Sequence, residues 1–228
     1  ARDWADDAVM RGGTLFDAGS PLRVSGPARL GRGAIRVVSP ESTDDRWVVR
    51  HYRRGGTFRS ILKDRYLRIG IPRPFLELEA SRRLVEGGIR TPAVIAAAVY
   101  PRGPFYRGDL VTRYAEARQL ISVLSEPNKA ERHNRALKGV SRAILRLARL
   151  GAHHVDLNAT NLLVDDDLDA APWVIDLDRM RFGVPPAEAT RAMSARLKRS
   201  LAKLECAPTV LELADALLPT GAATRGES

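Results

Sequence analysis

The chain has 228 residues, enough for one domain or two lobes around a full core, and its 44% hydrophobic and 28% charged residues are ordinary for a soluble globular protein. Its single cysteine, Cys206, excludes an intramolecular disulfide framework, and no apolar run approaches the roughly 18 residues needed to cross a bilayer. The formal net charge of +10 indicates a polyanionic partner, which is nucleic acid, an anionic membrane face or a heavily phosphorylated substrate.

The first half of the chain is predicted to be mostly β-structure with one helix. Residues 75–85 carry apolar side chains at helical spacing and are followed by Gly87-Gly88, which is typical of a helix C-terminus. Strands are expected where β-branched and apolar residues lie between turn signals: two strands within residues 22–38, and one each at residues 46–52, 92–100 and 110–114.

The second half is predicted to be mostly helical. Helices are expected at residues 119–124 and 136–150, and a last apolar stripe at helical spacing extends over residues 193–204. Two short apolar strands are expected between these helices, at residues 162–164 and 173–175.

The order of these elements indicates the fold class. A mostly β first half followed by a mostly helical second half is typical of α+β structure in two lobes. We expect residues 1–115 to form an N-lobe and residues 116–228 to form a C-lobe. A ligand is expected in the cleft between two such lobes, where ligand sites tend to lie.

The segment from His154 to Asn161, together with Asp176, is the most informative stretch of the sequence. It has the order H-x-D-x-x-x-x-N, followed by an aspartate at the end of an apolar strand, which is the pattern of a kinase catalytic loop. Phosphoryl transfer needs a carboxylate that orients the attacking hydroxyl and accepts its proton, a role predicted for Asp156. It also needs oxygen ligands that hold Mg²⁺ against the phosphates of ATP, a role predicted for Asn161 and Asp176. His154 is expected to pack and hold the loop.

A weaker motif precedes the strand at residues 46–52. Gly31 and Gly33 match the start of a Gly-rich phosphate loop, in which missing side chains let backbone N–H groups approach a nucleotide. The third glycine of G-x-G-x-x-G is absent, because Arg36 stands there, and a plain hairpin turn also explains the first two. The place of the motif before the strand favours the phosphate-binding interpretation.

Basic residues are concentrated between Arg50 and Arg73, where eight of them stand against one acid, Asp64. Such a run can be a solvated face, but its concentration beside a predicted phosphate site favours contact with an anionic lipid or a phosphorylated acceptor. The candidates for this substrate patch are Arg53, Arg54, Lys63, Arg65 and Arg68. A basic helix at residues 191–203 is a second candidate for lipid contact; the alternative is that its apolar stripe packs in the C-lobe.

These motifs resemble those of the lipopolysaccharide kinase family, in particular its 3-deoxy-D-manno-octulosonic acid (Kdo) kinases. The likeness covers residues 31–203, and its more specific marks lie at residues 50–56, 63–66, 156–159 and 175–179. The resemblance implies a protein-kinase-like fold with a small antiparallel-sheet N-lobe and a reduced, mainly helical C-lobe. It also implies a peripheral enzyme at the cytoplasmic face of the inner membrane, which uses ATP and Mg²⁺ to phosphorylate a Kdo hydroxyl on a lipid A precursor.

The resemblance further implies how the N-lobe holds ATP. Protein kinases hold the α- and β-phosphates with a lysine on the third strand, and the matching position carries Arg50. Its partner would be a carboxylate on the following helix. Glu77 fits best and Glu79 is the alternative, although either could be an ordinary solvent-facing charge.

Departures from the protein kinases bear on the acceptor. Asn158 stands where Ser/Thr protein kinases place a lysine, and no A-P-E signature occurs after Asp178. Asp178 itself replaces the glycine of D-F-G, and it could be a second metal ligand or an ion-pair partner of Arg179 or Arg181. We therefore expect the acceptor to be a sugar hydroxyl on a lipid, with no protein substrate and no nucleic-acid partner.

Two other functions fit part of the sequence. An aminoglycoside- or choline-type small-molecule kinase also carries H-x-D-x-x-x-x-N, but the basic segment argues against it. The other alternative is a non-catalytic scaffold of kinase-like fold that binds membranes or nucleic acid. Such a scaffold has no need of Asp156, Asn161 and Asp176 together, so their joint presence argues against it.

Overall fold

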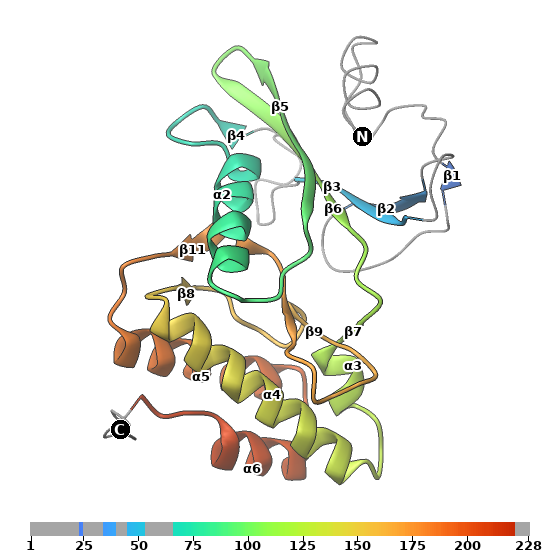
Figure 1. Ribbon diagram of the computed structural model, residues 1–228, viewed down its shortest axis with the longest axis vertical. Helices are drawn as coiled ribbons and strands as arrows, with labels where there is room; N and C mark the ends of the chain where they lie inside the picture. The colour runs from blue at the N-terminus through green and yellow to red at the C-terminus, as the bar shows by residue number, and fades with distance from the viewer. Residues whose placement is uncertain (1–22, 25–33, 40–44, 53–65, 222–228) are drawn as a thin grey trace. The chain divides into compact units, whose positions relative to one another are not determined.

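The computed structural model describes residues 23–24, 34–39, 45–52 and 66–221, which form two compact units (Figure 1). The first unit contains the described residues up to Ser81 together with Pro92–Ala115. The second contains Arg82–Thr91 together with the described residues from Glu116 onward. Helix α2 (Arg73–Glu86) therefore begins in the first unit and ends in the second.

The first unit is built on an antiparallel sheet. Strand β6 pairs with β5 along one edge and with β3 and β4 along the other, and β2 and β1 continue the sheet beyond β3. The strands are β1 (Arg23–Val24), β2 (Ala34–Ser39), β3 (Trp47–His51), β4 (Tyr66–Leu67), β5 (Val94–Arg102) and β6 (Phe105–Arg113).

The strands predicted in this half of the chain are confirmed. β1 and β2 pair as the expected hairpin, although Gly31 and Gly33 lie outside the described residues. β6 begins at Phe105 rather than at residue 110, because the turn after β5 occupies only Gly103 and Pro104. The short strand β4 was not predicted; its two residues are too few to show an alternating pattern.

Alternating side chains give this sheet two apolar faces. One cluster consists of Val38, Trp47, Val49 and Val111, and the other consists of Tyr52, Tyr66, Tyr106 and Leu110. The polar residues of β3 are divided in the same way. His51 lies on the same face as Val49, and Arg50 lies on the opposite face.

Helix α2 confirms the helix predicted at residues 75–85. Its buried side chains are spaced three and four residues apart, as in an amphipathic helix that covers a core: Glu77, Ala80, Ser81 and Leu84. The start of α2 lies close against β6, where the backbone N–H of Arg73 donates to the hydroxyl oxygen of Tyr106 at 3.1 Å. Gly108 permits this approach, since a Cβ at that position would lie 2.7 Å from Cγ of Pro74.

The second unit is mainly helical. Its helices are α3 (Leu120–Leu124), α4 (Ala130–Arg149), α5 (Pro186–Lys203) and α6 (Pro208–Leu217). Helices α4, α5 and α6 pack on one another, as Figure 1 shows. Helices α4 and α5 begin earlier than their apolar stripes predicted, and α6 was not predicted.

The apolar stripe of α5 belongs to this helical core. Met193, Leu197 and Leu201 are fully buried. The side chains that would have to enter a lipid surface are therefore already packed inside the protein. This excludes the hypothesis that the helix at residues 191–203 lies on a membrane by its apolar stripe.

Short strands frame the predicted catalytic loop in the second unit. Strand β9 (Leu162–Val164) lies between β7 (Arg118–Gln119) and β10 (Trp173–Val174), and β8 (His153–His154) pairs with β11 (Met180–Arg181). The loop runs from β8 to β9, so strands hold it at both ends. β9 and β10 were predicted; β7, β8 and β11 have two residues each and gave no sequence signal.

The predicted α+β fold is confirmed: an antiparallel sheet with one helix is joined to a mainly helical unit. No helix in the described part of the chain is both long and apolar enough to cross a membrane.

We predict that Gly108→Ala lowers the free energy of unfolding by about 1–3 kcal/mol, because the added methyl group overpacks the contact between β6 and α2. Chemical denaturation of the variant measures the loss. Adding Pro74→Ala removes the atom that the new methyl group meets, so the double variant should recover part of the stability. A Gly108→Ala protein as stable as the wild type would show that α2 is not held so close to β6.

Candidate active site

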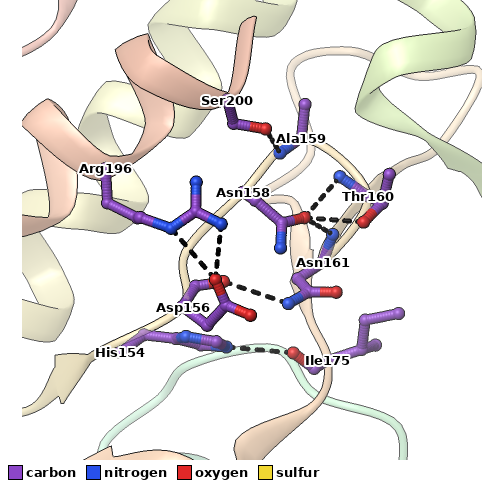
Figure 2. Close-up of polar contacts among 9 residues, drawn as sticks. All are labelled: His154, Asp156, Asn158, Ala159, Thr160, Asn161, Ile175, Arg196 and Ser200. Atoms are coloured by element: carbon purple, nitrogen blue, oxygen red, sulfur yellow. Dashed lines mark hydrogen bonds and ion pairs between the residues drawn. The ribbon is translucent and has the colours of Figure 1, made fainter. Parts of the chain in front are cut away.

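His154 fixes the start of the predicted catalytic loop. Its side chain is buried, and Nε2 donates to the carbonyl oxygen of Ile175 at 3.0 Å (Figure 2). The carbonyl oxygen of His154 accepts from the backbone N–H of Leu157 at 3.3 Å. The ring therefore joins the loop to the chain that follows β10, as expected for a residue that packs and holds the loop.

Asn158 closes the loop on itself. Its Oδ1 accepts from the backbone N–H and the hydroxyl of Thr160, at 2.9 and 2.6 Å, and from the backbone N–H of Asn161 at 3.1 Å (Figure 2). An Asn side chain that bonds its own backbone two and three residues on stabilises a tight turn. The residue in place of the protein-kinase lysine therefore shapes this loop.

The two predicted metal ligands lie on adjacent segments of chain. The side-chain Nδ2 of Asn161 donates to the carbonyl oxygen of Asp156 at 3.0 Å, which leaves its Oδ1 as the atom suited to a cation. The carbonyl oxygen of Asn161 accepts from the N–H of Ile175 at 3.0 Å, and Asp176 is the next residue. Asp176 has φ 64° and ψ 58°, a left-handed conformation that is costly for a residue other than glycine.

This pair fits a magnesium ion bound together with a nucleotide. An amide oxygen and a carboxylate are the hard ligands that Mg²⁺ prefers, and Mg²⁺ usually takes its remaining ligands from water and substrate phosphates. Among the described residues no group of three or more His, Cys, Asp or Glu could hold a metal ion. The ligands predicted for Mg²⁺ therefore stay Asn161 and Asp176, which would share the ion with water and the phosphates of the nucleotide.

The carboxylate of Asp156 is held by helix α5. Arg196 donates to its Oδ1 from Nε at 3.0 Å and from Nη2 at 2.6 Å. One helical turn further on, the hydroxyl oxygen of Ser200 accepts from the backbone N–H of Ala159 at 3.3 Å. Neither contact could be predicted from the sequence, because Arg196 lies 40 residues after Asp156 and no local pattern connects them.

A second polar cluster lies in the first unit, around Arg50. The Arg50 guanidinium forms an ion pair with the carboxylate of Glu77 and donates to the hydroxyl oxygen of Tyr52 at 3.0 Å. That hydroxyl group in turn donates to Glu77. Glu77 is 5% exposed whereas Glu79 is exposed, so the structure pairs Arg50 with Glu77. Tyr52 was missed, although it stands two residues after Arg50 and so shares its face of the strand.

A buried acid–base pair occupies the opposite face of the same strand. Nδ1 of His51 donates to Oδ1 of Asp109 at 2.5 Å, and the hydroxyl of Tyr100 donates to Oδ2 of Asp109 at 3.1 Å. Asp109 is 0% exposed, and a buried carboxylate is stable only where such partners satisfy it. The cluster joins three strands of the sheet, and sequence analysis gave no sign of it.

Much of the predicted substrate patch lies outside the described residues. Arg68 is described, and it is exposed in the segment between β4 and α2. The other four residues of the patch, Arg53, Arg54, Lys63 and Arg65, lie outside the described residues. The phosphate-loop candidates Gly31 and Gly33 also lie outside them.

His153, beside the loop, is a titratable neighbour of the site. Partial burial, together with the positive charge of Arg181, lowers the pKa of His153. The folded protein therefore favours the neutral ring, whereas the unfolded chain takes up a proton near the ordinary histidine pKa of about 6.5. The contribution of this residue to the free energy of unfolding is therefore lost as the pH falls below that value.

Comparison with known proteins identifies the family. The model of the lipopolysaccharide kinase (Kdo/WaaP) family matches residues 28–213. The chain belongs to this family. The resemblance found in the motifs is confirmed, and membership makes the chain a phosphotransferase of lipopolysaccharide biosynthesis.

Two curated relatives match most of the chain. The 3-deoxy-D-manno-octulosonic acid kinase of Vibrio parahaemolyticus is 33% identical over 186 residues, which cover 78% of this chain and 75% of that protein. The protein of the same name from Xylella fastidiosa (strain 9a5c) is 33% identical over 176 residues, which cover 76% of this chain and 68% of that protein. Among solved structures, the bifunctional kinase-methyltransferase WbdD aligns with a TM-score of 0.47 at 18% identity, over 81% of this chain and 43% of that one.

We predict that Glu77→Gln lowers phosphotransferase activity roughly tenfold or more, because it removes the charged partner of Arg50, and such hydrogen bonds contribute about 1.5–3 kcal/mol. Steady-state kinetics with varied ATP measure the effect. Glu79→Gln on the same helix is the matched control and should keep wild-type activity. Equal activity of the Glu77 and Glu79 variants would contradict a role for the Arg50–Glu77 pair.

Proposed function

We propose that the protein is an ATP- and Mg²⁺-dependent kinase that phosphorylates a hydroxyl of Kdo on a lipid A precursor. The observation that carries the proposal is the arrangement of Asp156, Asn161 and Asp176, which hydrogen bonds through Ile175 hold on adjacent segments. The acceptor is supported by the relatives, which are named 3-deoxy-D-manno-octulosonic acid kinases.

In this reaction the acceptor oxygen forms a bond with the γ-phosphorus of ATP, and the bond from that phosphorus to the β–γ bridging oxygen breaks, so that ADP leaves. Asp156 orients the acceptor hydroxyl and accepts its proton. Arg50, fixed by Glu77, supplies positive charge to the nucleotide phosphates. Asn161 and Asp176 would hold Mg²⁺, which would supply positive charge to the phosphates.

The loop itself argues against a protein acceptor. In Ser/Thr protein kinases a lysine follows the catalytic aspartate by two residues. Here Asn158 takes that place and uses its side-chain oxygen for three hydrogen bonds within the loop. Asn158 therefore stabilises the turn of the loop, and the loop has no positive charge at the position of the protein-kinase lysine.

The test is ATP turnover by purified protein with a panel of acceptors, namely Kdo-bearing lipid A precursor, an aminoglycoside, choline and a peptide library. We expect Mg²⁺-dependent phosphorylation of the glycolipid and none of the peptides. Efficient phosphorylation of an aminoglycoside or choline, without the glycolipid, would favour the small-molecule kinase. The absence of ATP turnover with every acceptor would favour the non-catalytic scaffold.

Two substitutions separate the predicted base from the predicted metal ligand. Asp156→Asn should keep wild-type affinity for Mg·ATP and lose about 10²–10⁴-fold in kcat, because it removes only the proton acceptor. Asp176→Ala should lose affinity for ATP in the presence of Mg²⁺ as well as rate, because it removes a direct ligand. Calorimetric titration of ATP with and without Mg²⁺ measures the difference. Wild-type Mg·ATP affinity in folded Asp176→Ala would refute the metal role.

We propose further that the enzyme works at the anionic cytoplasmic face of the inner membrane. The end of β4 and the segment that leads to α2 expose three apolar side chains, with Leu67 44%, Ile69 81% and Ile71 64% exposed. Leu67 and Ile69 flank the basic residue Arg68, and Ile71 lies two residues before Arg73. Exposed apolar side chains next to positive charge suit a surface of anionic lipid, since both burial and electrostatic attraction favour it.

Joint replacement of Ile69 and Ile71 by serine should therefore weaken binding to vesicles that contain anionic phospholipid, at low and at high salt. Replacing Arg68 by glutamine should weaken it mainly at low salt, by about 1 kcal/mol, because charge attraction is screened. Leu204→Ser, at an exposed apolar position on the second unit, is the control. Vesicle sedimentation measures binding, and wild-type affinity of the Ile69 and Ile71 variant would exclude this surface.

A further inference from the structure

We propose that Arg196 is a positioning residue for the proton-accepting carboxylate: it fixes one oxygen of Asp156 and thereby directs the other oxygen at the acceptor hydroxyl. The inference rests on the proposed function, in which Asp156 accepts the proton. It adds a residue from α5, outside the sequence motifs, to the machinery of phosphoryl transfer.

The geometry of the contact is selective for one oxygen. Both Nε and Nη2 of Arg196 donate to Oδ1 of Asp156, at 3.0 and 2.6 Å, as Figure 2 shows. Within the described part of the chain, Oδ2 of Asp156 accepts no hydrogen bond. A carboxylate without such a contact rotates about a broad, roughly two-fold torsion, so its two oxygens exchange places. Arg196 removes that freedom and leaves Oδ2 for the hydroxyl.

Arg196 can do this because its helix is rigid. Its neighbours Met193 and Leu197 are fully buried in the helical core of the second unit. One turn later, Ser200 bonds the backbone N–H of Ala159, so α5 contacts the loop at two points. A side chain on a packed helix holds a reacting group more accurately than a side chain on a loop.

Two other cations of α5, Lys198 and Arg199, are placed differently. Nζ of Lys198 lies 2.9 Å from a carboxylate oxygen of Asp215, on helix α6. Arg199 is exposed to solvent. The side chains of Arg196 and Asp156 are 31% and 36% exposed, so their contact is partly shielded from water yet remains reachable by a substrate. Arg199 thus offers a control of equal charge on the same helix.

The expected effect is on kcat. Arg196→Gln should lower kcat roughly 10–10²-fold, as a loss of alignment near a reacting atom does, while affinity for Mg·ATP stays at the wild-type value. Arg196→Lys keeps the charge but supplies a point donor in place of the planar fork, so its kcat should lie between those of wild type and Arg196→Gln. Arg199→Gln should behave as the wild type.

The deciding experiment is a double-mutant cycle with Asp156→Asn, measured on full-length protein with the acceptor that the panel identifies. If Arg196 acts through Asp156, adding Arg196→Gln to Asp156→Asn costs no further kcat, because the group that it positions is already inactive. A merely structural role predicts the opposite, namely that the two losses multiply. Ser200→Ala removes the neighbouring contact to the loop and should lower thermal stability. Its effect on kcat should be independent of the effect of Asp156→Asn.

Guanidinium rescue gives an independent measurement that does not depend on how well one variant folds. Added guanidinium ions should raise kcat of Arg196→Ala severalfold and leave kcat of Asp156→Asn unchanged. Multiplying losses in the cycle, or wild-type kcat in Arg196→Gln, would overturn the inference. Either result leaves the proposed function intact, since that function is decided by which acceptor the wild-type enzyme phosphorylates.

Discussion

The two backbone hydrogen bonds of Ile175 hold the candidate site together. The carbonyl oxygen of Ile175 accepts from the buried ring of His154, and its N–H donates to the carbonyl oxygen of Asn161. One residue thus binds both ends of the catalytic loop. Because Asp176 follows directly, these bonds also fix where its carboxylate can lie relative to Asn161. Both bonds are made by the backbone of Ile175, so its side chain takes no part in them.

Helix α5 supports the loop from another direction by combining two kinds of contact. Its buried stripe packs into the helical core, while Arg196 and Ser200 bond the side chain of Asp156 and the backbone of Ala159. The helical core therefore stabilises the second unit and also sets the position of α5, which bonds the catalytic loop. In the first unit, α2 plays the corresponding part, because its buried face carries Glu77 to Arg50.

Local spacing predicted what lies close together in the chain. The loop from His154 to Asn161 and the strand before Asp176 could be found because their residues follow one another at fixed intervals. The choice of Glu77 over Glu79 needed the orientation of α2, which decides which of two nearby carboxylates is buried. The distance to Gly88 favoured Glu77 in the sequence without settling the choice.

Contacts between distant segments that no family motif links could not be predicted from the sequence. Arg196 is one positive charge among several on the basic helix predicted at residues 191–203, and nothing local distinguishes it from Arg199. The cluster of His51, Asp109 and Tyr100 depends on the pairing of strands far apart in the chain. The strands that were not predicted, β4, β7, β8 and β11, are likewise products of tertiary packing, since a pair of residues has no periodicity.

The left-handed backbone of Asp176 places fold stability and activity in competition. A glycine would adopt φ 64° and ψ 58° without the steric cost that a side chain brings, which is roughly 1–3 kcal/mol. Selection of random variants for thermal stability alone would accordingly enrich glycine at this residue. The variants recovered in that way would be more stable to heat but would lack the carboxylate on which phosphoryl transfer is proposed to depend.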